Sequence, residues 1–335
     1  MIADLKERSV YLDAYLRPLA EWLGREDVTD ILINAPGEVW VETLGGGTQR
    51  FAAPELTETT LWRLAGQIAA ATHQGVSREH PLLAATLPDG GRVQIVAPPA
   101  TRGPMAIAIR KHVVTDLSLD DYAASAAFDA ARSVSLDEGS DQDRALQAVL
   151  DGGDIAGFLK MAVQGRKNII VSGGTSTGKT TFLNALVKEI PAQERLIVIE
   201  DTPEVRLDHA NAVGLIAVRG TLGEARVSVE DLLQASLRMR PDRIILGELR
   251  GPEAYSFLRA VNSGHPGSIT TVHADSPRAA VEQIALMVLQ AGANLGRREI
   301  IDYVGGVVDV AVQLSRSDGR RIVSEVAFRP SQPLR

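Results

Sequence analysis

In the second half of the chain, short apolar runs alternate with segments whose apolar residues have helical spacing. The apolar runs cover 168–171, 195–200, 243–246 and 268–272. The helical segments include 181–189, 229–238 and 277–290. Strands that alternate with helices in this way build a mostly parallel sheet with helices on both faces. Two extended runs around Asp318–Gly319, at 307–314 and 321–328, predict a closing hairpin.

The first half has a different pattern, with few crossover units between strands. Apolar positions over 4–23 and 57–72 have helical spacing, and Thr57 is a suitable N-cap for the second helix. Extended runs predict strands at 28–34, 38–42, 91–96 and 106–111. This half is therefore expected to form a small α+β domain ahead of the α/β domain.

The stretch 129–144 separates the two patterns. It is acidic, rich in small residues and weakly periodic, which is typical of an interdomain linker. We therefore divide the 335 residues into an α+β N-terminal domain at 1–128, a linker at 129–148 and an α/β domain at 149–335. A chain of this length has room for two domains.

Composition narrows the class of protein. The chain is 45% hydrophobic and 23% charged, has a net charge of −7 and contains no cysteine. These values fit a globular protein with full cores, exclude disulfides and zinc–thiolate sites, and argue against nucleic acid as the main partner. The sequence has no run near the ~20 apolar residues that span a bilayer, and its first residues lack the core of a signal peptide. We therefore expect a cytoplasmic protein whose membrane association is peripheral.

The strongest chemical signal follows the run 168–171, where residues 173–181 read Gly-Gly-Thr-Ser-Thr-Gly-Lys-Thr-Thr. They match the phosphate-loop pattern, in which backbone N–H groups cradle phosphates, the lysine reaches the β- and γ-phosphates and the threonine after it binds Mg²⁺. The following helix adds the positive end of its dipole. We therefore predict that ATP binds here with Mg²⁺. The expected nucleotide contacts are Gly173, Gly174, Thr175, Ser176, Thr177, Gly178, Lys179, Thr180 and Thr181.

Two of the following strands end in carboxylates, at Glu200–Asp201 and at Glu248. Because ligand sites lie at the carboxyl ends of parallel strands, both are expected beside the phosphate loop. We assign Glu200 to activating the attacking water and Glu248 to the Mg²⁺ side, directly or through water, and leave the reverse division of roles open. His273, which follows the run 268–272, is assigned as a γ-phosphate sensor in preference to a metal ligand.

Together these segments resemble the secretion ATPase superfamily, which includes type II secretion motors, pilus retraction motors and type IV secretion traffic ATPases. Four motifs carry the resemblance: the phosphate loop at 173–180, an Asp box at 199–203, a Walker B segment at 245–250 that ends its strand in Gly-Glu, and a His box at 264–274. The N-terminal half resembles the type IV secretion branch, the eleventh component of VirB systems, at 30–40, 87–94 and 106–111.

The resemblance implies that the α/β domain is RecA-like and that six copies form a homohexameric ring, with nucleotide between the two domains of a subunit. Arginines of the N-terminal domain act as fingers on the phosphates in this family, and Arg92 and Arg110 match those positions, with Arg102 as a weaker candidate. A guanidinium fork suits the charge of a transferring phosphoryl group. The implied activity is Mg²⁺-dependent ATP hydrolysis that powers a type IV secretion system from the cytoplasmic face of the inner membrane. Channel components and coupling ATPases are the implied partners.

Three alternatives stay open at this point. A type IV pilus or type II secretion motor would use the same engine. A nucleic-acid motor would share a RecA-like ring, although the acidic charge and the lack of a basic, aromatic groove argue against it. A nucleotide-gated structural ring would bind ATP with little turnover. The linker path is also open, since it decides whether the N-terminal domain covers its own or a neighbouring nucleotide domain.

Overall fold

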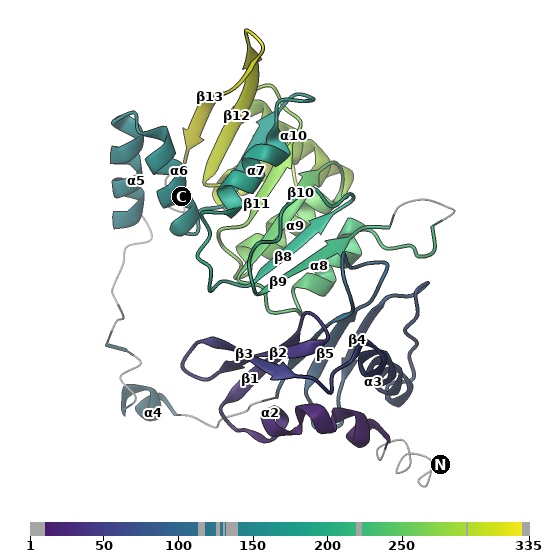
Figure 1. Ribbon diagram of the computed structural model, residues 1–335. Coiled ribbons are helices and arrows are strands. Elements are labelled where there is room, and N and C mark those ends of the chain that lie inside the picture. Colours follow the sequence, from purple (N-terminus) through teal and green to yellow (C-terminus); the bar gives the residue numbers. More distant parts are fainter. Residues whose placement is uncertain are drawn as a thin grey trace.

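The computed structural model describes residues 11–112, 118–124, 128–129, 131, 140–218, 223–292 and 294–329. These residues form two sheets, one in each half of the chain. Figure 1 shows the first half, in purple and blue, packed below the second half, in green and yellow, with α4 (Leu119–Ala124) and α5 (Asp141–Asp151) along one side.

The N-terminal half is built on a six-stranded sheet in the order β3-β2-β1-β6-β5-β4, with every neighbouring pair antiparallel. Its strands are β1 (Val28–Ile33), β2 (Gly37–Thr43), β3 (Thr48–Ala53), β4 (Leu82–Thr86), β5 (Arg92–Val96) and β6 (Ala106–Arg110). Its helices are η1 (Arg17–Leu19), α2 (Ala20–Gly24) and α3 (Glu58–Ala71). Thr57 caps α3 by accepting the Thr60 N–H at 3.1 Å, as predicted.

The C-terminal half is built on a seven-stranded sheet in the order β13-β12-β7-β11-β10-β8-β9, in which only the β12–β13 pair is antiparallel. Its strands are β7 (Ile169–Gly173), β8 (Leu196–Glu200), β9 (Ala212–Ile216), β10 (Arg243–Leu249), β11 (Ile269–Val272), β12 (Val310–Ser317) and β13 (Arg320–Phe328). Its helices are α5 (Asp141–Asp151), α6 (Ile155–Gln164), α7 (Lys179–Val187), α8 (Val229–Ser236), α9 (Glu253–Asn262), α10 (Pro277–Gln290) and α11 (Arg297–Val307), and α4 (Leu119–Ala124) precedes them in the chain. In the part of the chain that the structure describes, no helix is long and apolar enough to cross a membrane.

The central strands of the second sheet are buried on both faces. Along β8, Ile197 and Ile199 belong to the core formed with α8, α9, α10 and α11. Leu196 and Val198 belong to the opposite core, formed with α5, α6 and α7. Since successive side chains of a strand point to opposite faces, one continuous apolar run serves both cores. The structure thus confirms an α/β fold with a mostly parallel sheet, preceded by a smaller α+β unit.

Several elements were not predicted. Half of the residues of β3 are exposed, and only Ala53 is buried, so the strand shows no apolar alternation. β9 contains Gly214, and α11 contains Gly305 and Gly306, which lower strand and helix propensity. β4 is short and only partly buried.

The predicted linker, 129–148, overlaps a helix. α5 begins at Asp141, after a capping box in which the Ser140 side chain accepts the Asp143 N–H at 3.1 Å. Residues 132–139 of the linker lie outside the described residues, as do residues 4–10 of the first predicted helix. The domain boundaries therefore stay a prediction.

The two halves meet along β9, an edge strand of the second sheet. The Arg102 N–H donates to the Gly214 carbonyl and the Ile216 N–H donates to the Ala100 carbonyl, both at 2.9 Å. The Arg102 side chain forms an ion pair with Glu200 at the end of β8, where the two side chains are 16% and 4% exposed. A Cβ atom on Gly214 would lie 2.5 Å from Arg102 Cδ, so the absence of a side chain at Gly214 makes room for the Arg102 side chain.

Removing one partner of this buried ion pair is expected to destabilise the protein strongly. Replacing Arg102 by Ala leaves the buried Glu200 carboxylate without its cation, and we expect the free energy of unfolding in urea to fall by about 3 kcal/mol. Glu200→Ala should lower the free energy of unfolding by a similar amount. The double variant should lower it by no more than about 1 kcal/mol beyond either single variant.

Arg78 provides the matched control, because it also pairs across the halves, with Glu224 at 2.8 Å, but both side chains are at least half exposed. Arg78→Ala should lower the free energy of unfolding by less than about 1 kcal/mol. Equal losses for Arg102→Ala and Arg78→Ala would contradict the importance given to the buried pair.

Candidate nucleotide-binding site

The carboxyl ends of β7, β8, β10 and β11 meet at one edge of the second sheet, beside a cavity of about 480 Å³. The structure therefore gathers most of the predicted phosphate loop and three predicted catalytic side chains around Lys179. The predicted residues that line the cavity are Thr175, Ser176, Gly178, Lys179, Thr180, Thr181, Glu200, Glu248 and His273.

The phosphate loop joins β7 to α7 through a turn that requires glycine at two positions. Gly178 is the N-cap of α7 and has φ +93°, in the left-handed region that favours glycine. At Gly173, a Cβ atom would lie 2.5 Å from Thr177 Oγ1 and 2.9 Å from the Leu314 carbonyl oxygen. Thr177 is buried and donates to the Gly174 carbonyl at 2.9 Å. Gly173, Gly174 and Thr177 therefore shape the loop without lining the cavity.

Lys179 lies at the start of α7 and connects the loop to the His box. Its Nζ donates to the carbonyls of Gly173 at 3.0 Å and Gly174 at 3.2 Å. Burial lowers the pKa of Lys179, and the charge of Glu248 opposes that shift. The remaining contact of Nζ is with His273 Nδ1 at 3.3 Å.

His273 connects Lys179 to the Walker B segment. If Lys179 donates to Nδ1, the neutral ring carries its proton on Nε2, which lies 2.8 Å from Glu248 Oε1 and donates to it. The hydrogen-bonded line Lys179–His273–Glu248 therefore crosses the cavity. His265, the other histidine of the His box, bonds the Pro241 carbonyl at 3.1 Å and is absent from the cavity lining.

Arg250 connects Glu248 to the Asp box. Its Nε donates to Glu248 Oε2, and its Nη1 lies 3.3 Å from Asp201 Oδ2. The hydrogen bond to Glu248 raises the pKa of Arg250. Both Asp201 and Arg250 line the cavity. The two carboxylate-ended strands, β8 and β10, are thus joined by one guanidinium.

Glu200 is the most buried carboxylate of the cavity. Its Oε1 accepts the backbone N–H groups of Glu204 at 3.0 Å and Val205 at 2.8 Å, and its other oxygen faces Arg102. Arg102 Nη1 also donates to the Val205 carbonyl at 2.6 Å. To take a proton from water, this carboxylate must exchange one of its present partners.

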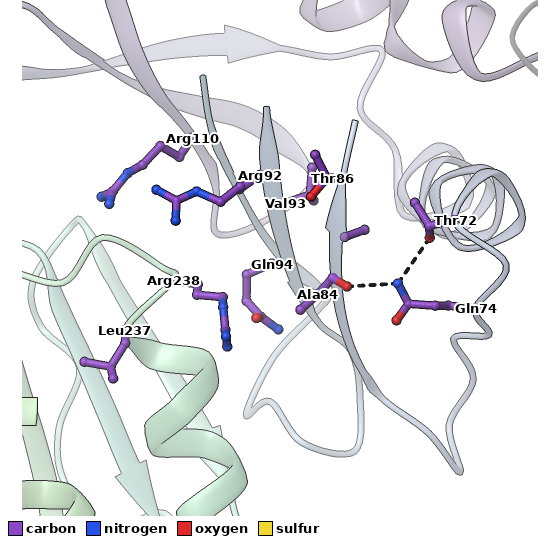
Figure 2. Close-up of a pocket in the computed structure, with 11 residues that line it drawn as sticks. Thr72, Gln74, Ala84, Thr86, Arg92, Val93, Gln94, Arg110, Leu237 and Arg238 are labelled. Atoms are coloured by element: carbon purple, nitrogen blue, oxygen red, sulfur yellow. Dashed lines mark hydrogen bonds between the residues drawn. The ribbon is translucent and has the colours of Figure 1, made fainter. Parts of the chain in front are cut away.

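The structure does not bring Arg92 or Arg110 to the phosphate loop of this chain. Both line a second cavity, of about 430 Å³, together with Arg238 (Figure 2). Because Arg238 precedes β10 and Glu248 lies near its carboxyl end, the two cavities lie at opposite ends of that strand. The weaker candidate, Arg102, is the N-terminal arginine that contacts a predicted catalytic residue.

Sequence reasoning missed Arg321, which lines the nucleotide cavity from β13. No sequence motif marks this residue. It reaches the cavity because the β12–β13 hairpin pairs beside β7, far away in the sequence. It also gave no role to Arg250, although this residue lies within the Walker B segment.

Gly173→Ala is expected to weaken ADP binding, because its Cβ would collide with Thr177 and with the Leu314 backbone. We expect the dissociation constant measured by isothermal titration calorimetry to rise at least about tenfold, or 1.4 kcal/mol. Gly174→Ala is the matched control, since its Cβ would have no neighbour nearer than 3.9 Å and its φ is not positive. Equal affinities for the two variants would contradict the steric role of Gly173.

The chain is similar to known proteins over most of its length. The model of the "Type II/IV secretion system protein" family matches residues 144–324. The chain is 40% identical over 334 residues to the type IV secretion system protein VirB11 of Brucella suis, covering 97% of this chain and 92% of that protein. It is 38% identical over 328 residues to VirB11 of Bartonella henselae, covering 94% and 92%.

A solved structure agrees over nearly the whole chain. The crystal structure of the VirB11 ATPase from the Brucella suis type IV secretion system, in complex with sulphate, matches with a TM-score of 0.89 and 39% identity. The match covers 96% of this chain and 98% of the other. The chain therefore belongs to the type II/IV secretion system protein family, within its group of VirB11-type ATPases of type IV secretion.

Proposed function

We propose that this chain hydrolyses ATP with Mg²⁺ and that a ring of six copies powers a type IV secretion system, in substrate transfer, pilus biogenesis or both. One observation carries the proposal: the line Lys179–His273–Glu248 crosses a cavity that also contains Thr180 and Glu200. The line connects the lysine that holds phosphate to a strand-end carboxylate. A change at the terminal phosphate is thereby transmitted to β10 and β11, which supports a sensor role for His273.

The residues of the cavity fit Mg²⁺. The Thr180 hydroxyl and the Glu248 carboxylate, directly or through water, would supply oxygen ligands, which this cation prefers. Among the described residues, no three His, Asp or Glu side chains form a metal-binding group. Nucleotide-bound Mg²⁺ needs few protein ligands, because phosphates and water complete its shell. When bound, the ion neutralises charge on the β- and γ-phosphates.

We assign the proton transfer from the attacking water to Glu200. This carboxylate is held by two backbone N–H groups and by Arg102 of the N-terminal half. A movement of that half which draws Arg102 away frees one oxygen of Glu200 toward the cavity. Glu248 then acts on the Mg²⁺ side, held by His273 and Arg250. Domain position and proton transfer are coupled through a single ion pair in this assignment.

Arg92 and Arg110 are assigned as the fingers that stabilise charge on the transferring phosphoryl group. Since they lie at the opposite end of β10 from Glu248 within one chain, they reach phosphates only through a neighbouring subunit or a rearranged linker. A closed ring with a repeated heterologous interface supplies such a neighbour. A ring of six also converts hinge motion into work on a substrate.

We place the ring at the cytoplasmic face of the inner membrane, held there by partners. Inner-membrane channel components and coupling ATPases are the proposed partners, and sequence-specific nucleic acid binding is not part of the proposal. The alternative is a pilus or type II secretion motor with the same engine. Recovery of pilus platform proteins, in place of channel components, in a pull-down would favour that alternative.

Lys179→Ala should abolish ATP turnover, because no other ammonium in the described cavity lining can reach the β- and γ-phosphates. A phosphate-release assay should show at least about a 100-fold lower kcat. Circular dichroism should match that of the wild-type protein. Lys188→Ala is the control, since this exposed lysine lies just beyond α7 and outside the cavity. Substantial turnover by Lys179→Ala would sink the assignment of the site.

Replacing Arg92 and Arg110 together by Ala should leave ATP binding in place but slow hydrolysis by at least about 100-fold, as expected when arginine fingers are lost. Arg92→Ala alone should show part of this loss and keeps the 2.9 Å ion pair between Arg110 and Asp30. Arg238→Ala, which alters the same second cavity from the C-terminal half, should retain most of the activity. A kcat near wild type in the double variant would refute the finger assignment.

A further inference from the structure

The β12–β13 hairpin extends past the end of the phosphate-loop strand. β12 runs parallel to β7 with Leu314 beside Gly173, the last residue of β7. It continues to Ser317, and β13 returns with Arg321 paired to Arg316. At about 3.3 Å per residue, Arg321 stands roughly 7 Å beyond the level of Gly173. The tip of the hairpin therefore overhangs the loop that follows β7.

A bulge in β13 decides which face Arg321 occupies. Gln313 pairs with Glu325 and Leu314 pairs with Val323, so Ser324 is the extra residue. Because paired residues point to the same face, Val323 and Arg321 share the face of Leu314, which belongs to the core of α7. In a regular ladder that face would receive even-numbered residues. The bulge thus turns Arg321 toward α7 and the phosphate loop.

The side chain of Arg321 lies against Gly178, the N-cap of α7. A Cβ atom on Gly178 would be 3.0 Å from Arg321 Cδ and 3.4 Å from both Nε and Nη1. The guanidinium therefore stands beside the N-terminus of α7, and it lines the same cavity as Lys179 and Thr180. The missing side chain at Gly178 leaves the space that the arginine stem fills.

The Lys179 and Arg250 side chains of this cavity already have partners. Lys179 donates to two loop carbonyls and to His273, and Arg250 is shared between Glu248 and Asp201. In the described part of the chain, the Arg321 side chain has neither a hydrogen-bond nor an ion-pair partner. It can meet an incoming anion without breaking an existing interaction.

We propose that Arg321 binds the phosphate groups of the nucleotide, closing the phosphate loop from the side of the C-terminal hairpin. The assignment rests on the proposed nucleotide site and adds to it a contact supplied by the same chain as Lys179. A guanidinium suits this position, since its fork donates two hydrogen bonds to one phosphate. The hairpin thereby becomes part of the site.

Arg321→Met tests the proposal, because methionine keeps an aliphatic stem against Gly178 and removes only the charged fork. Titration calorimetry with ADP should give a dissociation constant at least about tenfold higher than that of the wild-type protein, the loss expected for one charge-assisted hydrogen bond. Pyrophosphate, which carries no base or ribose, should lose affinity by a similar factor. The thermal unfolding midpoint should be unchanged, since the side chain is exposed.

Arg320→Met is the matched control. It removes the same charge from the same hairpin, but Arg320 pairs with Ser317 and points to the opposite face. Its affinities for ADP and pyrophosphate should stay within about twofold of wild type. Equal affinity in Arg321→Met and Arg320→Met would overturn the proposal.

Two further outcomes separate this inference from the proposed function. A loss of ADP affinity in Arg321→Met with unchanged pyrophosphate affinity would overturn the phosphate contact, because it would move the contact to the base or ribose. Failure of the wild-type protein to bind ADP would overturn the proposed function itself. Binding by wild type and Arg320→Met with loss in Arg321→Met supports both.

Discussion

The burial of the parallel strands on both faces is the constraint on which the rest of the structure depends. Helices cover both sides of β7, β8, β10 and β11, so their side chains are committed to packing and chemistry is left to the strand ends. The carboxyl ends of these strands supply the phosphate loop, Glu200, Glu248 and His273 to one cavity. The hydrogen bonding of the sheet fixes the spacing between these strand ends, and the loops that follow the strands complete the cavity.

Different arginines of the N-terminal half lie at the two ends of the second sheet. At the carboxyl end, Arg102 enters from the N-terminal half and holds Glu200. Toward the amino end of β10, Arg92, Arg110 and Arg238 surround a second cavity between the halves (Figure 2). The N-terminal half thus places arginines at both ends of the second sheet of the same chain. Of the two ends, as far as the structure describes them, only the carboxyl end has one of these arginines paired with a predicted catalytic carboxylate, through Arg102 and Glu200.

Sequence reasoning succeeds where a feature is local. The phosphate loop is contiguous, the strand-end carboxylates follow apolar runs, and Thr57 caps its helix within one turn. It fails where distant segments determine the geometry. The place of Arg102 depends on pairing with β9, which contains Gly214 and has weak strand propensity. The place of Arg321 depends on the extra residue Ser324, and no sequence rule marks that bulge.

The pairing of the N-terminal half with β9 also affects how the protein can be divided. Residues Ala100 and Arg102 occupy backbone groups on the outer side of that strand, and Leu32, Val96 and Ala108 join the core of the second sheet. Cutting the chain between the halves would expose both an open strand edge and an apolar face. Exposed edges of this kind template aggregation. A soluble ATPase fragment would therefore need its first half supplied, either covalently or as a separate polypeptide.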